Sequence, residues 1–196
     1  LILGAGVAGS NAAEVAMGMQ GDVTVVDRTK KNRDRVRAQM GHKLQTATPE
    51  QIAELASKAD LIVGAALAAG AKAPKLITHE MVRGMRPGSV LVDISIDQGG
   101  CFETSRPTTL ADPTYVVDGV VHYCVTNMPG DVPRTSTYAL NHATLPFLRA
   151  LADKGWERAC ADDPHLAEGL NVQAGQIRHP AVAEALQTWN QVPGTR

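Results

Sequence analysis

The sequence predicts an α/β fold, a doubly wound parallel sheet followed by a helical segment. Short apolar runs alternate with helical stretches through the first half of the chain. These runs lack the alternation of apolar and polar residues that marks a half-exposed strand, so helices should cover both faces of the sheet. Because crossovers between parallel strands are right-handed, the sheet is expected to be doubly wound.

The first 128 residues are expected to form this sheet and its helices. The runs that predict strands are 1–3, 23–27, 43–45, 61–65 and 89–94. The stretches that predict helices are 7–19, 30–40, 49–58 and 79–85. Two later runs, 115–117 and 120–125, flank Asp118-Gly119. This dipeptide favours a tight turn, so the two runs can form a hairpin whose second strand joins the sheet edge.

The pattern changes from Pro133 onward. Apolar residues recur at close to the helical period in 135–152, and 181–189 is a second amphipathic stretch. We identify no further strand there. Residues 129–196 are therefore expected to form helices that pack on something outside the sheet, and the chain divides into 1–128 and 129–196.

Composition and charge exclude several classes of protein. The chain has 196 residues, of which 44% are hydrophobic and 20% charged, as in globular domains. With 19 Lys and Arg against 20 Asp and Glu, its net charge of -1 provides no basic field for nucleic acid. No apolar run approaches the roughly 18 residues of a membrane span. We expect neither a nucleic-acid nor a membrane partner.

The cysteines and the start of the chain add two expectations. Cys101, Cys124 and Cys160 are odd in number and lack paired metal-ligand spacing, which favours a reduced, cytoplasmic protein and gives no basis for a metal. The chain starts at Leu1 with three apolar residues before a glycine, whereas strands typically have about 5–6 residues. We expect the first strand to be cut and the chain to be part of a longer protein.

A glycine loop follows the first strand. Gly4-Ala5-Gly6-Val7-Ala8-Gly9 has the pattern G-x-G-x-x-G between a strand and a helix. The first glycine permits a tight turn, the second lets the backbone approach a pyrophosphate, and the third lets the helix pack on the strand. Free amides at the helix N-terminus would meet the phosphate charge. Such loops also occur for packing reasons alone.

Asp27 ends the second strand, close to the spacing at which an acid binds the adenosine ribose in a Rossmann-type domain. The alternative is that Asp27 only caps the helix that begins near Thr29. A carboxylate there repels a 2′-phosphate, so the sequence favours NAD over NADP. Arg28 and Lys30 follow it and partly soften that preference.

Three loops follow later strands, at the sheet edge where ligands bind: 64–67, 93–100 and 125–130. Asp97 carries the most chemistry, because a carboxylate there can orient an amine or water or assist proton transfer. The alternative is a turn-forming Asp bonded to local amides. Arg106 and Asn127 are polar candidates that can equally serve loop structure. His122 lies near the same edge and can face the sheet as readily as a substrate.

Several longer stretches are more specific than the glycine loop. They are Gly70-Ala71-Lys72-Ala73-Pro74-Lys75-Leu76, Met85-Arg86-Pro87-Gly88-Ser89-Val90, residues 93–100 and residues 127–137. In these stretches the chain resembles the alanine dehydrogenase family, from residue 1 to about residue 155 and more weakly to its end. The NAD-binding subunit of proton-translocating transhydrogenase shares the first two stretches. The Thr135-Ser136-Thr137 region and the loop around Asp97 favour alanine dehydrogenase.

The resemblance implies reversible oxidative deamination of L-alanine to pyruvate and ammonium, with hydride passing to NAD. It implies that the pyrophosphate lies on Gly4, Gly6, Val7 and Gly9, that the ribose binds Asp27, and that Asp97 is catalytic. The further cofactor contacts that it implies are Ala66, Leu67, Ile94, Ser95, Ile96, Asp97, Arg106, Val125, Thr126, Asn127 and Met128.

The same resemblance implies a cytoplasmic homo-oligomer, a hexamer, in which residues 129–196 form part of the substrate domain. The family's catalytic histidine and its carboxylate-binding residues would precede Leu1, and we do not promote Lys72 or Lys75 to their place. Two alternatives stay open. One is a transhydrogenase-type NAD-binding domain, and the other is a dinucleotide sensor without catalysis.

Overall fold

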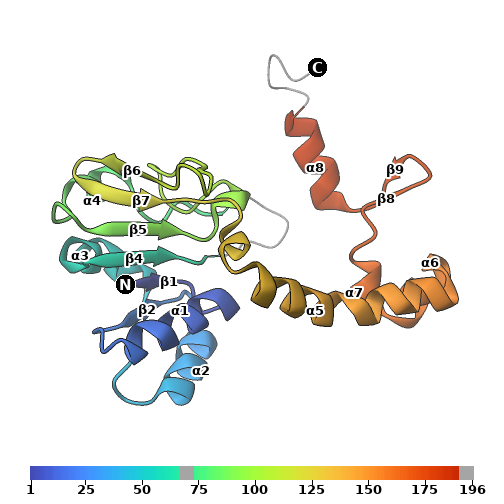
Figure 1. Cartoon of the computed structure of the whole chain (residues 1–196), viewed down its shortest axis with the longest axis horizontal. Helices are drawn as coiled ribbons and strands as arrows, with labels where there is room; N and C mark the ends of the chain where they lie inside the picture. Colours follow the sequence, from blue (N-terminus) through green and yellow to red (C-terminus); the bar gives the residue numbers. More distant parts are fainter. Residues whose placement is uncertain (67–72, 190–196) are drawn as a thin grey trace. The chain divides into compact units, whose positions relative to one another are not determined.

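The computed structural model describes residues 1–66 and 73–189. They fall into two compact units, Leu1–Met128 and Pro129–Arg196 (Figure 1). Within the described residues, the first unit contains a seven-stranded sheet in the order β3-β2-β1-β4-β5-β7-β6. Its strands are β1 (Ile2–Leu3), β2 (Thr24–Val26), β3 (Gln45–Ala47), β4 (Leu61–Gly64), β5 (Val90–Asp93), β6 (Thr114–Val117) and β7 (Val120–Tyr123).

Neighbouring strands of this sheet are parallel, apart from the antiparallel pair β6 and β7. The hairpin predicted at Asp118-Gly119 is confirmed. Val117 pairs with Val120, and both turn residues have positive φ, 49° and 79°, as a two-residue turn of this hand requires. The second strand of the hairpin, β7, joins β5 in parallel, and β6 forms the edge.

The helices and short 3-10 turns of the first unit connect these strands. They are α1 (Val7–Gly18), α2 (Lys30–Met40), η1 (Pro49–Gln51), α3 (Ile52–Lys58), α4 (His79–Arg83) and η2 (Ile96–Gln98), and η3 (Met128–Asp131) lies at the boundary of the units. Thr48 starts η1 with a capping box and Pro49 at the first position. The expected strand at 43–45 lies two residues later, as β3.

Two hydrophobic clusters explain why the strands appear in the sequence as continuous apolar runs. Ile2, Val25 and Val63 lie in one cluster, whereas their chain neighbours Leu3, Val26 and Ile62 lie in the other. Since successive side chains of a strand point to opposite faces, both faces of the sheet are buried. The first cluster includes residues of α1 and α2, and the second includes residues of α3 and α4, which cover the other face (Figure 1). This is the doubly wound α/β architecture that the sequence predicts.

The second unit begins with a long helix, α5 (Pro133–Lys154), followed by α6 (Trp156–Asp162), α7 (Pro164–Ala167) and α8 (Pro180–Trp189). None of the α5 side chains is buried, and Tyr138, Leu140, Phe147 and Leu148 are exposed apolar residues on it. Among the described residues, no helix has the length and apolar character needed to span a membrane.

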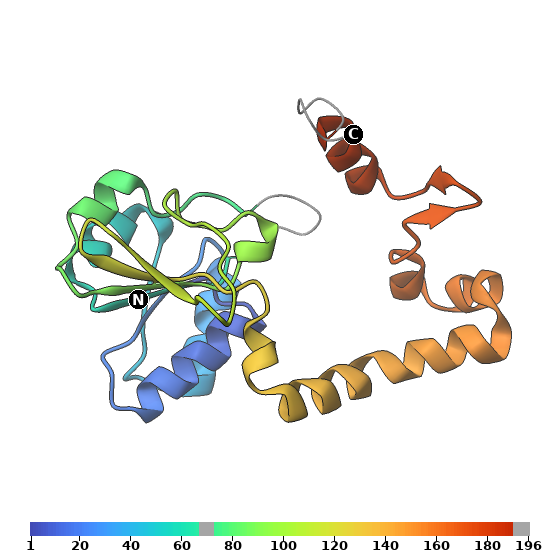
Figure 2. The same ribbon diagram turned by 45° about the horizontal axis from the view of Figure 1, so that its top comes forward.

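The helices expected in this segment are present, but the sequence indicates no strand there, and the structure contains two. β8 (Val172–Gln173) and β9 (Gln176–Ile177) form a small antiparallel pair, drawn as two orange arrows in Figure 2. The turn between them is Ala174-Gly175, and both residues have positive φ, 48° and 75°. Alanine rarely adopts that conformation, so the sequence carries only a weak signal for this hairpin.

Candidate functional site

The loops after β1, β2, β4, β5 and β7 leave the sheet at one edge, because these strands are parallel. β1 lies between β2 and β4, so the chain winds outward in one direction to β3 and then returns to the other side of β1. In open α/β sheets, ligands bind outside the carboxyl ends of the strands at such a switch in strand order. The glycine loop leaves β1 at this point.

The three glycines of the loop are required for different reasons. Gly4 has φ +109°, and a Cβ there would lie 2.5 Å from the carbonyl oxygen of Ala65. A Cβ on Gly9 would lie 1.8 Å from the carbonyl oxygen of Gly4. Around Gly6, by contrast, no atom of the described residues beyond its immediate chain neighbours and helix backbone lies within 4 Å of the Cβ position. The fold itself requires Gly4 and Gly9, whereas Gly6 leaves open space beside the N-terminus of α1, where a phosphate group fits.

A cavity of about 400 Å³ lies beside this loop. Of the residues that the sequence singles out, Gly4, Gly6, Asp27 and Ala66 line it. Arg28, which the sequence places beside Asp27, also lines it, whereas sequence reasoning did not single out other lining residues, among them Asn32, Pro49, Ile52 and Leu76. Polar side chains near Asp27 and apolar ones from η1 and α3 suit a ribose and an adenine respectively. The volume and lining fit the adenosine half of a dinucleotide.

The carboxylate of Asp27 links the glycine loop to the start of α2. Its Oδ2 accepts a hydrogen bond from the Ala5 amide (2.9 Å), and its Oδ1 accepts one from the Thr29 amide (2.8 Å). The Asn32 side chain donates to the same Oδ1 at 3.3 Å. Asp27 therefore makes the local contact to Thr29 that the capping alternative expects, and it also lines the cavity.

The loop after β5 is organised around the buried carboxylate of Asp93. Asp93 accepts hydrogen bonds from the amides of Ser95 (3.1 Å) and Cys101 (2.9 Å) and from the hydroxyl of Ser105. The Cys101 thiol also donates to it, at 3.5 Å. Burial, and then the charge of Asp93, raise the pKa of this thiol, so Cys101 is a poor nucleophile at neutral pH.

Asp97 lies in η2, on the same loop, with its side chain exposed. It makes no hydrogen bond or ion pair with the described residues. The neighbouring Ser95 is buried, and its hydroxyl donates to the carbonyl of Ala66 at 2.8 Å. This bond brings together two of the expected contact segments, the loop after β4 and the loop after β5. Leu67 lies outside the described residues.

The other expected contact residues differ in exposure. Val7 is 83% exposed, and Ile94, Arg106, Thr126 and Asn127 are also exposed. Ile96 and Val125 are buried, and Met128 is half-buried. The guanidinium of Arg106 lies 3.9 Å from the centre of the Tyr115 ring, which holds it against the hairpin.

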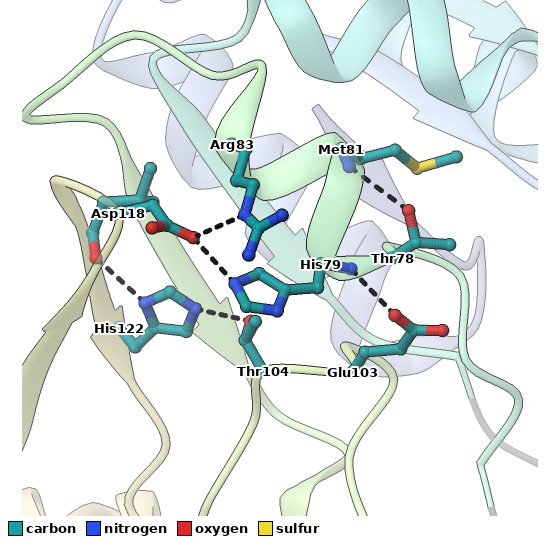
Figure 3. A network of polar contacts seen from close by, with 9 residues as sticks. Thr78, His79, Met81, Arg83, Glu103, Thr104, Asp118 and His122 are labelled. Carbon is teal, nitrogen blue, oxygen red and sulfur yellow. Dashed lines mark hydrogen bonds and ion pairs between the residues drawn. The ribbon is translucent and has the colours of Figure 1, made fainter.

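His122 is fully buried in β7 and bonded within the protein on both ring nitrogens (Figure 3). Nδ1 lies 3.0 Å from the Val120 carbonyl and Nε2 lies 2.7 Å from the Thr104 hydroxyl. Its ring stacks on Tyr115 at 4.9 Å. Burial lowers the pKa of His122, so the neutral ring joins the hairpin to the segment around Thr104. It faces the sheet rather than a ligand.

Among the residues that the structure describes, no group of three or more His, Cys, Asp or Glu side chains is placed to hold a metal ion. The groups that this edge presents are the glycine loop, the acid after β2 and the exposed Asp97. A doubly wound sheet with a glycine loop after β1 and an acid after β2 defines a dinucleotide-binding domain of the Rossmann type.

Comparison with known proteins gives the family. The chain belongs to the family described as alanine dehydrogenase/PNT, C-terminal domain, whose model matches residues 1–180. It is 56% identical over 186 residues to alanine dehydrogenase of Halomonas elongata, covering 94% of this chain and 50% of that protein. It is 52% identical over 188 residues to alanine dehydrogenase of Mycolicibacterium smegmatis, covering 95% and 51%. The chain thus spans about half the length of the curated relatives it matches.

Solved structures agree with this assignment. An L-alanine dehydrogenase matches with a TM-score of 0.84 and 44% identity, covering 95% of this chain and 52% of that one. A transhydrogenase from Sinorhizobium meliloti is more distant, with a TM-score of 0.71 and 25% identity over 92% of this chain and 49% of that one. The family resemblance seen in the sequence is confirmed.

Proposed function

We propose that this chain is the NAD-binding part of an alanine dehydrogenase, which converts L-alanine, water and NAD⁺ reversibly to pyruvate, ammonium, NADH and a proton. The observation that carries the proposal is 56% identity to an alanine dehydrogenase across 94% of the chain. The open space at Gly6 and the cavity beside Asp27 support it, because both fit a dinucleotide.

The residues of this chain would bind the cofactor along the sheet edge. Amides at the N-terminus of α1 face the pyrophosphate, and Gly6 leaves room for it. Asp27 accepts hydrogen bonds from the ribose hydroxyls and repels a 2′-phosphate, which favours NAD over NADP. Ala66, Ser95 and Arg106 lie on the loops that follow, toward the nicotinamide. When bound, NAD supplies the acceptor for the hydride that leaves the α-carbon of alanine.

Asp97 is the catalytic residue that we assign to this chain. Its carboxylate is exposed and free of partners among the described residues, so it is available to a substrate. We assign it proton transfer at the imine and carbinolamine stages, together with a histidine from the part of the family's enzymes that precedes this segment.

Residues 129–196 would contribute to the substrate domain of the complete enzyme. A 22-residue helix that buries no side chain while exposing Tyr138, Leu140, Phe147 and Leu148 is expected to pack against further protein. The relatives, of which this chain spans about half, contain such further protein. By family resemblance we also propose a cytoplasmic homohexamer.

The test is NADH formation, followed at 340 nm, by the full-length gene product with L-alanine and NAD. L-alanine-dependent reduction that disappears with D-alanine supports the proposal. The runner-up is a transhydrogenase-type NAD-binding domain, whose solved relative is a more distant match than the alanine dehydrogenase. NADH binding without any alanine-dependent reduction would reject alanine dehydrogenase in favour of that domain or of a sensor without catalysis.

A further inference from the structure

Lys75 and Asp93 hold the two ends of one peptide group. The Lys75 ammonium donates to the carbonyl oxygen of Gly100 at 2.9 Å, and the amide of Cys101, in the same peptide group, donates to Asp93 Oδ2 at 2.9 Å. A cation therefore binds the oxygen of this group while an anion accepts its hydrogen. Charge-assisted hydrogen bonds of this kind are stronger than neutral ones, so the orientation of the group is firmly fixed.

Asp93 also fixes both ends of the loop that carries Asp97. It accepts from the amide of Ser95, before Asp97, and from the amide of Cys101, after it. Gly100 makes this possible, because a Cβ on it would lie 2.6 Å from Asp93 Oδ2 and its φ is +73°. The glycine is thus required by the buried carboxylate rather than by a ligand.

Lys75 completes the arrangement from the outer side. Its ammonium also donates to the carbonyls of Gly99 (2.7 Å) and Phe102 (2.9 Å), so all three of its hydrogen atoms are bonded to this loop. Lys75 consequently has no donor left for a substrate carboxylate. The segment that carries it also pairs with the loop by backbone bonds, from Ala73 to Gln98 and from Leu76 to Cys101.

The residues that follow Phe102 are held independently of Lys75. The amide of His79 donates to the Glu103 carboxylate at 2.8 Å, and the Thr104 hydroxyl bonds to His122 (Figure 3). Loss of the Lys75 ammonium should therefore loosen the loop while the segment around Thr104 remains in place. The Asp97 carboxylate has no hydrogen bond or ion pair with the described residues, so its position depends mainly on the backbone of the loop.

We propose that Lys75 is a positioning residue, which acts with the buried Asp93 to hold the loop 94–101 so that Asp97 faces the substrate. The proposal rests on the function proposed above, since it takes Asp97 as the catalytic residue. Neither Lys75 nor Asp93 would touch the reacting atoms. Lys75 acts on the reaction only through the geometry of the peptide groups between Gly99 and Phe102.

The first experiment measures the loop directly, without substrate or cofactor. Amide hydrogen exchange is compared in the full-length gene product, Lys75→Met, Lys75→Arg and a matched control, Lys58→Met. Lys58 is an exposed lysine whose ion pair with Glu54 lies on α3, away from the loop. We expect exchange in the loop 94–101 to be about tenfold faster in Lys75→Met only. Equal exchange in Lys75→Met and the wild type would overturn the proposal.

The second experiment separates positioning from stability. Gly99 is exposed but Gly100 and Phe102 are buried, so Lys75→Met leaves two buried carbonyls without this donor and should lose some stability. Its thermal midpoint is measured first, to show that it is folded at the assay temperature. We expect its kcat for L-alanine to fall by roughly tenfold or more, with NADH affinity nearly unchanged and with kcat restored by Lys75→Arg. A normal kcat in Lys75→Met, in an active wild-type background, rejects this inference alone. An inactive wild type instead rejects the proposed function, while the exchange result still reports on the loop.

Discussion

The carboxylate of Asp27 accepts a 2.9 Å hydrogen bond from the amide of Ala5, twenty-two residues earlier, so the acid after β2 holds the glycine loop after β1. Its second oxygen is occupied by Thr29 and Asn32. Each carboxylate oxygen has about two acceptor positions, so Oδ2 keeps one for a further donor such as a ribose hydroxyl. Asp27 can therefore cap the start of α2 and bind a ribose hydroxyl at the same time.

Replacing Asp27 by Ala should weaken NADH binding and relax discrimination against NADPH. Loss of hydrogen bonds to a charged group costs about 1.5–3 kcal/mol, which corresponds to roughly ten- to a hundredfold in affinity. The affinity for NADPH should fall less, because the repulsion between Asp27 and the 2′-phosphate disappears. Fluorescence titration with both cofactors measures the ratio, with Asp22→Ala as the control at an exposed aspartate. An unchanged ratio would mean that Asp27 is a structural cap only.

Alanine at Gly6 should weaken NADH binding, whereas alanine at Gly9 should lower the stability of the fold. A Cβ at Gly6 has open space around it, so the free energy of unfolding should change by less than about 1 kcal/mol, while NADH binding weakens by roughly tenfold or more. A Cβ at Gly9 collides with the Gly4 carbonyl and should destabilise the fold by about 1–3 kcal/mol or more. Urea denaturation and NADH titration of both variants separate the two effects. Equal loss of stability in both would contradict the assignment of Gly6 to the ligand.

Asp97→Asn in the full-length gene product should lower kcat for L-alanine by about 10²–10⁴-fold, the range expected for loss of a proton-transferring group. NADH affinity should remain within a few-fold, because the glycine loop and Asp27 are unchanged. Steady-state kinetics and NADH titration give the two numbers. Asp112→Asn serves as the control at an exposed aspartate before β6. Turnover like that of the wild type would remove Asp97 from the mechanism.

His122 should make the protein less stable in mild acid. Burial lowers the pKa of His122 in the folded protein below its ordinary value of 6.5; the Val120 carbonyl and Asp93 oppose this shift, and Arg106 adds to it. The unfolded chain therefore binds more protons than the folded one just below pH 6.5, so the free energy of unfolding should fall as the pH decreases through that range.

Urea denaturation between pH 5 and 8 checks this dependence. His122→Gln should be less stable at pH 8 but should depend less steeply on pH than the wild type. The exposed His42, replaced by Gln, serves as the control position. A wild-type protein whose advantage over His122→Gln stays constant from pH 8 to 5 would show that this ring does not titrate differently on folding.

The fold could be predicted largely because its signals are local. Chain neighbours such as Ile2 and Leu3 are both buried, on opposite faces, and this is visible as an uninterrupted apolar run. Asp118-Gly119 predicts the hairpin, because both residue types tolerate the positive φ that its turn requires. The pair β8 and β9 was missed because its turn places alanine, a residue without that tolerance, at φ 48°.

The candidate site was predictable only in part, since much of it depends on contacts between distant segments. The glycine loop and Asp27 follow a recognisable spacing. Pro49 and Ile52 reach the cavity from η1 and α3, and no local pattern marks them as lining residues. Asn32 lies five residues after Asp27, on the first turn of α2. The helix predicted to begin at residue 30 could have indicated that the Asn32 side chain lies close to Asp27. The role of Lys75 depends on carbonyls more than twenty residues away.

The hydrogen bonds of Asp93 also determine when the loop becomes ordered. Fixing the backbone of one residue costs about 1–2 kcal/mol of conformational entropy, and a loop that orders only around its ligand subtracts that cost from affinity. Here Ser95 and Cys101 are tied to a carboxylate inside the protein, so the segment between them is set during folding. Ligands that contact this segment should therefore bind without waiting for it to become ordered.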